Sequence, residues 1–131
     1  NELLLQRLST MFDQLGMADA GADLIMHNVQ GMVDLNNKAV REAQAGEHDK
    51  AIAMFQQALQ EMPESIQLML NLVNAVIAQV HLKGWHESHV RQAYDYLQKV
   101  RQVAPTNNKL QKLMQAWRLL IEQHDKREFL L

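Results

Sequence analysis

The sequence predicts an all-α protein, and three observations support this fold class. Helix-forming residues, chiefly Ala, Leu, Gln, Glu, Lys and Met, dominate the 131 residues. Only two prolines and five glycines occur, and the β-branched residues are not gathered into the alternating runs that are typical of strands. Apolar side chains instead recur every three or four residues, which is the spacing of one face of an α-helix.

The composition also limits the function. A chain of 131 residues with a formal charge of -2 and a pI near 6.3 suits one domain, and gives no reason to expect nucleic acid or an anionic membrane as a partner. It has no cysteine, so a disulfide, a thiolate nucleophile and a cysteine-bearing zinc site are excluded. No signal peptide or membrane-spanning run is visible. We expect a cytoplasmic chain and, because it begins with Asn1, a piece of a longer protein.

The first third of the chain predicts three helices. Residues 2–15 carry an apolar seam, residues 17–31 carry a weaker one, and residues 33–45 carry a clear one. The third helix is expected to end at Gly46, because glycine favours the residue that follows a helix.

The middle of the chain predicts a helical hairpin. A helix over residues 50–62 ends at Pro63, and a second begins after Ser65, whose side chain can cap free backbone N–H groups. This second helix, residues 66–81, is apolar almost all round and is therefore expected to be buried on most sides. One lane along it is different, at steps of four, three, four and three: Gln67, Asn71, Asn74, Ala78 and His81.

The polar lane has two interpretations. Its amides either satisfy each other and the nearby backbone, or they face a water-filled groove and bind a ligand. The sequence leaves both open.

The last third predicts a loop and two helices. Residues 81–88 are polar and contain a glycine, so we expect a loop, with Ser88 capping a helix over residues 89–103. A final helix begins at residues 106–108 and carries a regular apolar stripe. The apolar end, residues 129–131, is expected to dock on the body, to dock on another chain, or to continue into a further domain.

The two hairpins share one apolar pattern, which recurs 42 residues later. Ala51, Phe55, Ala58 and Pro63 correspond to Ala93, Leu97, Val100 and Pro105. Small residues let two helices approach closely, the large residue fills the gap to the next hairpin, and proline ends the unit. With Gly46 at the turn, this pattern resembles the tetratricopeptide repeat, whose signature runs W-x2-L-G-x2-Y, A-x3-F and P over about 34 residues.

The resemblance covers about residues 32–123 and is stronger in the second helix of each unit. The first-helix signature positions hold Leu35, Lys38, Ala39 and Glu42 in the first unit, and Met69, Leu72, Val73 and Val76 in the second. The residues beyond a 34-residue repeat are expected to form an insertion at residues 81–88. A period near 42 would also suit a HEAT-type repeat, but the Gly46 turn and the spacing around both prolines favour the tetratricopeptide reading.

The resemblance implies stacked antiparallel hairpins in a right-handed superhelix of about seven helices. Residues 1–31 would form an N-terminal extension, and residues 32–131 the repeat domain with a C-terminal capping helix. Its implied role is a protein-interaction scaffold that binds a peptide along the concave surface of the first helices. That surface would include Asn36, Asn37, Val40, Gln44, Gln67, Asn71, Asn74, Ala78, Lys109, Lys112 and Ala116.

Some members of the family clamp a peptide C-terminal carboxylate with Lys, Asn, Asn, Lys and Arg. The matching positions here hold Asn36, Val40, Asn71, Lys109 and Leu113. Only two of the five agree, so we do not expect a carboxylate clamp.

No catalytic or metal-binding motif stands out. The chain has no Gly-rich phosphate loop, no HExxH and no G-x-S-x-G. His81, His86 and His89 are close in sequence but read as surface histidines, and Trp85 is expected to pack its loop down. We therefore expect no enzyme activity, no cofactor and no metal.

The resemblance also implies a module of a larger signalling or regulatory protein, as in many bacterial members of the family. A homo-oligomerisation module is the alternative function, with a homodimer formed through the apolar ends, residues 3–15 and 117–131. A small-ligand or enzyme accessory domain is a third class, for which no motif is visible.

Overall fold

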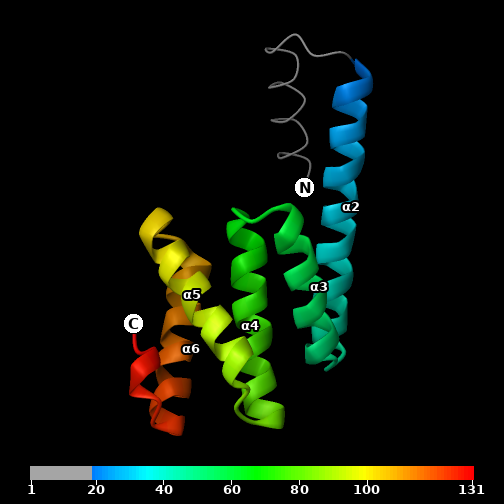
Figure 1. Ribbon diagram of the computed structural model, residues 1–131. Helices are drawn as coiled ribbons and strands as arrows, with labels where there is room; N and C mark the ends of the chain where they lie inside the picture. Colours follow the sequence, from blue (N-terminus) through cyan, green and yellow to red (C-terminus); the bar gives the residue numbers. More distant parts are fainter. Residues whose placement is uncertain (1–18) are drawn as a thin grey trace.

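The described part of the chain is all-α, as the sequence predicts. The computed structural model describes residues 19–131. Within them lie the following elements (Figure 1): α2 (Asp19–Gln44), α3 (His48–Glu61), α4 (Ile66–Lys83), α5 (Glu87–Val103), α6 (Asn108–His124) and the short 3-10 helix η1 (Arg127–Phe129). Each helix packs against the next one in the chain, and α4 also packs against α6. The result is a stack of antiparallel helices with α4 at its centre.

The number of helices differs from the sequence-based expectation of seven, because residues 19–131 hold five α-helices. The two helices expected over residues 17–31 and 33–45 form one continuous helix, α2, which extends well beyond its neighbours (Figure 1). Gly31 costs an α-helix only about 0.5–1 kcal/mol relative to alanine, which is too little to break it. The helix expected over residues 2–15 lies outside the described residues.

The prediction of a loop over residues 81–88 is also wrong. Helix α4 continues to Lys83 and α5 begins at Glu87, so the connection is much shorter. Gly84 makes the sharp turn possible, with φ 98° and ψ −176°, a backbone region that is essentially restricted to glycine. The residues beyond a 34-residue repeat therefore do not form a loop insertion but belong largely to α4 and α5.

The cap of α5 is His86 rather than Ser88. The Nδ1 atom of His86 accepts a hydrogen bond from the backbone N–H of His89 at 3.4 Å. The sequence misses this cap because histidine is not among the preferred capping residues.

The 42-residue period extends to the helix caps. The Ser65 hydroxyl accepts a hydrogen bond from the backbone N–H of Leu68 at 3.2 Å and starts α4. The Asn107 side chain does the same for Leu110 at 3.0 Å and starts α6. The six apolar residues that define the repeat are all buried: Ala51, Phe55, Ala58, Ala93, Leu97 and Val100. The two hairpins are thus equivalent in their caps as well as in their core.

Helix α4 is buried on most sides, as predicted, with ten of its 18 residues buried. The expected stripe of α6 is buried as well, at Leu110, Leu113, Trp117, Leu120 and Ile121. None of the helices in residues 19–131 combines the length and the apolarity needed to cross a membrane.

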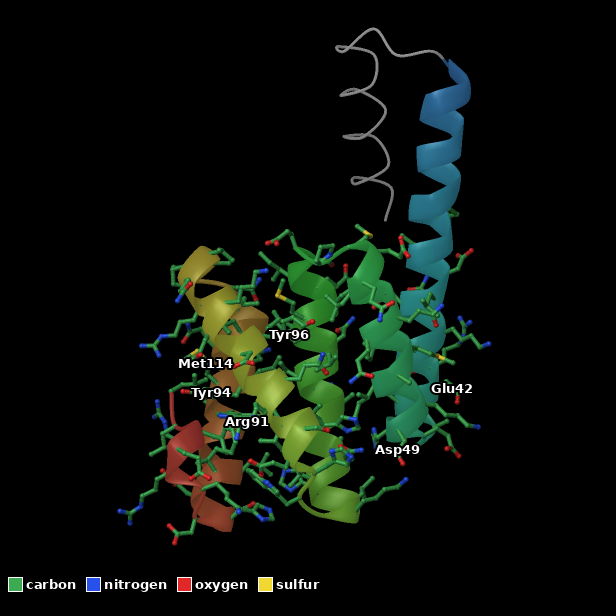
Figure 2. The ribbon with its side chains drawn as sticks, in the orientation of Figure 1. Glu42, Asp49, Arg91, Tyr94, Tyr96 and Met114 are labelled. Carbon is green, nitrogen blue, oxygen red and sulfur yellow. The ribbon has the colours of Figure 1, made fainter. Side chains whose placement is uncertain are left out.

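The C-terminal segment docks on the body of the same chain. Phe129 is 1% exposed, and its carbonyl oxygen accepts a hydrogen bond from Trp117 Nε1 at 2.8 Å. Trp85 and Tyr94 lie against the Phe129 ring, with ring centroids 5.7 and 5.5 Å away. Figure 2 shows Tyr94 and Arg91 on the side of α5 that faces this segment, and the Arg91 guanidinium lies over the same ring. Trp85 is therefore a packing residue, as expected.

Candidate functional site

A groove of about 350 Å³ lies between α2, α4 and α6, with α3 contributing His48 and Phe55 to its lining. Three of these elements are helices that the resemblance assigns to the concave surface. The lining residues are Val40, Ala43, Gln44, His48, Phe55, Asn71, Asn74, Ala75, Ala78 and Lys109. Most of the apolar members are small, and none of the ten is acidic.

The polar lane of α4 passes through this groove. Asn71, Asn74 and Ala78 line it, whereas Gln67 and His81 are exposed beyond its ends. The lane is therefore divided between the groove and open surface.

Asn71 also connects three helices. Its Nδ2 donates a hydrogen bond to Asn36 Oδ1 of α2 at 3.0 Å, and its Oδ1 accepts one from Lys109 Nζ of α6. Asn36 is 9% exposed, so this contact satisfies a buried amide. Partial burial lowers the pKa of Lys109 from its usual value, because desolvation disfavours the charged amine.

The structure brings together six of the eleven residues proposed from the sequence. Val40, Gln44, Asn71, Asn74, Ala78 and Lys109 line the groove. The other five do not line it. Asn36 is buried and Ala116 is half-buried, while three are exposed: Asn37, Gln67 and Lys112. Leu113, a position compared with the carboxylate clamp, is buried in the core.

The segment that forms most of the groove matches a known family. Residues 42–83 match the family model described as tetratricopeptide repeat. This segment is a tetratricopeptide repeat. It contains eight of the ten groove-lining residues, and the other two are Val40 and Lys109. No curated protein and no solved structure matched the chain.

The sequence reasoning missed His48, which is the first residue of α3 within the tetratricopeptide repeat. Its side chain is only 7% exposed and lines the groove. Among the residues that the structure describes, its Nδ1 atom is buried and has no hydrogen-bond partner. A signal was available, because His48 precedes Ala51, Ile52 and Phe55 on one helical stripe, at intervals of three, four and seven.

A second polar cluster joins the tetratricopeptide repeat to α5. Asp49 accepts hydrogen bonds from Lys83 Nζ at 2.9 Å and from Gln79 Nε2 at 2.5 Å, and these bonds lower its pKa. Gln79 is 3% exposed, and its Oε1 lies 3.0 Å from His89 Nδ1. Figure 2 shows Asp49 near the start of α3, where these helices converge. The cluster fastens α3, α4 and α5 together, so its role is structural.

The three neighbouring histidines do not form a metal site. His86 and His89 stack with ring centroids 3.8 Å apart, and burial lowers the pKa of His89, with the nearby His86 charge adding to this effect. His81 is exposed on α4. Within the described part of the chain, no three His, Cys, Asp or Glu side chains gather into a group that could hold a metal ion.

Proposed function

We propose that this chain binds an extended peptide segment of another protein in the groove between α2, α4 and α6. A tetratricopeptide repeat is a helical scaffold for protein interaction, typically without enzymatic activity. The observation that carries the proposal is the lining of the groove: the amides of Gln44, Asn71 and Asn74 surround a hollow with small apolar side chains. Amides offer donors and acceptors to a peptide backbone, while the apolar hollow accepts a side chain.

The charge of the lining narrows the class of peptide. Lys109 is a cation in the groove, and no acidic residue lines it. Like charges across an interface are costly, so a segment with a net positive charge is disfavoured. The occupant that fits is therefore a neutral or acidic segment.

The test is selection from a random dodecapeptide library displayed on phage, followed by affinity measurements on synthetic peptides. The blocking variant is Ala78→Tyr, which fills the groove with an uncharged ring. The matched control is Ala53→Tyr, because Ala53 is exposed on α3 and does not line the groove. We expect peptides that bind the unchanged protein and the control alike, but bind Ala78→Tyr at least about tenfold more weakly.

Two results would contradict the proposal. One is a selection that enriches no peptide at all. The other is a set of peptides that bind both tyrosine variants equally, because such peptides would occupy a different surface.

The resemblance leads us to propose further that the groove serves a larger signalling or regulatory protein. A homodimer through the C-terminal apolar residues is less favoured, because Trp117, Ile121 and Phe129 are buried within their own chain. Light scattering over a concentration series tests this point, and a dimer that persists on dilution would favour the oligomerisation function.

A further inference from the structure

His48 is the one groove residue with an unmet bonding requirement among the residues that the structure describes. A buried polar atom without a partner destabilises the protein that contains it, and such atoms are rare in folded chains. An apolar side chain of similar size would avoid this cost at the start of α3. The position of His48 in the groove suggests that a bound ligand supplies the missing partner.

The surroundings of His48 indicate what kind of group that partner is. Ala43, Ala75 and Phe55 line the same groove and are apolar, so these three side chains offer no partner to a buried charge. A neutral polar group on a short side chain loses less hydration free energy than a charged group when it leaves water. A hydroxyl group can donate or accept, so it suits either tautomer of the imidazole. Because Nδ1 is itself buried, a hydroxyl in the groove can reach this nitrogen only after a half-turn of the ring about its Cβ–Cγ bond, which exchanges the positions of Nδ1 and Cδ2 without changing the ring's shape.

We propose that the groove is specific for a peptide segment carrying serine or threonine, whose hydroxyl group hydrogen-bonds to the imidazole of His48. This inference rests on the proposed function and adds to it the residue type that the groove selects. In it, His48 determines specificity, while the amides and Lys109 hold the rest of the segment.

The experiment uses the peptides that are sensitive to Ala78→Tyr. We expect them to share a serine or threonine. Each is then synthesised with threonine or valine at that position, because the two residues have the same shape and differ in the hydroxyl group. Affinities are measured for the unchanged protein, for His48→Leu and for His48→Asn, which keeps a short polar group.

We expect the unchanged protein to prefer threonine over valine by about tenfold, which corresponds to one hydrogen bond. His48→Leu should reduce this ratio to about one, and His48→Asn should retain part of it. If His48→Leu does not fold, the imidazole ¹⁵N resonances of the unchanged protein provide the same test. The His48 nitrogens should shift with the threonine peptide and not with its valine partner.

The possible failures are distinguishable. If no peptide is sensitive to Ala78→Tyr, the proposed function is wrong and this inference falls with it. If such peptides exist but share no serine or threonine, this inference alone is wrong. The same holds if the threonine-to-valine ratio is unchanged in His48→Leu, or if the His48 resonances do not respond to the threonine peptide.

Discussion

Asn71 Nδ2 donates a hydrogen bond to Asn36 Oδ1 over 3.0 Å, joining α4 to α2. This contact means that the polar lane of α4 has two kinds of member. Asn71 satisfies a buried neighbour and so contributes to the fold, while Asn74 is exposed in the groove. Asn71 therefore fits the first of the two interpretations that the sequence left open, and ligand binding by Asn74 is part of the function proposed above.

Removing either amide of this pair should destabilise the fold. Asn36→Ala and Asn71→Ala should each lower the free energy of unfolding by about 1–2 kcal/mol, because the remaining amide loses its partner. The free energy of unfolding lost in the double variant should be smaller than the sum of the two single-variant losses, by about 0.5–1.5 kcal/mol. Urea denaturation measures all three. Asn37→Ala is the control, since Asn37 is exposed, and should stay within about 0.5 kcal/mol. Strict additivity would show that the contact contributes nothing.

The C-terminal segment should be part of the folded unit. Phe129→Ala should lower the free energy of unfolding by about 3–5 kcal/mol, because it leaves a cavity beside Trp85 and Tyr94. The adjacent Leu130→Ala should cost much less, because Leu130 is 43% exposed. Thermal and urea unfolding of both variants check this. Equal effects, or a loss below about 1 kcal/mol for Phe129→Ala, would mean that the docked segment is not required.

Substitution of glycine by alanine should change stability in opposite directions at two positions. Gly84→Ala should destabilise the protein by about 1–3 kcal/mol, because alanine is strained at φ 98°. Gly31→Ala should stabilise it by about 0.5–1 kcal/mol, because Gly31 lies inside α2 and a new Cβ meets nothing within 4 Å. Differential scanning calorimetry measures the change in stability of both variants. A stabilising Gly84→Ala would contradict the turn geometry between α4 and α5.

Stability should fall on mild acidification. The folded-state pKa of His89 is lowered from 6.5, mainly by burial and also by the neighbouring His86, so the unfolded chain binds this proton more readily. The contribution is present above pH 6.5 and is lost as the pH falls through the lower folded-state pKa. His89→Asn should therefore reduce the slope of unfolding free energy against pH below pH 6.5. An unchanged slope would show that other groups set the pH dependence.

A second acid transition should involve Asp49. Hydrogen bonds from Lys83 and Gln79 lower its folded-state pKa below 3.8, so its contribution is present above pH 3.8 and is lost at more acidic pH. Asp49→Asn should accordingly weaken the pH dependence in that lower range. It should not weaken the dependence near pH 6, because the Asp49 charge raises the pKa of His89, and its loss leaves that pKa lower still. Unfolding in urea at fixed pH values separates the two ranges.

Much of the fold was predictable because it depends on contacts between residues close in sequence. The intervals of three and four set the buried face of each helix, and Ser65 and Asn107 lie within one turn of the backbone groups that they cap. The repeat of Ala51, Phe55 and Ala58 at 42 residues reflects the same packing used twice. Six groove residues were predictable for the same reason, because each lies at a concave-surface position on the first helix of a repeat unit.

The sequence by itself thus determined the all-α class, the 42-residue hairpin repeat and the polar lane of α4. Only the tertiary structure decided that α2 is continuous past Gly31, that His86 starts α5, and that His48 is buried in the groove. In the first two cases the competing local conformations differ by only about 1 kcal/mol in free energy, so the packing of neighbouring helices decides between them. The intervals within α3 place His48 on its buried face, but its position in the groove depends on α2, α4 and α6 converging there, and no interval within a single helix records where other helices will lie.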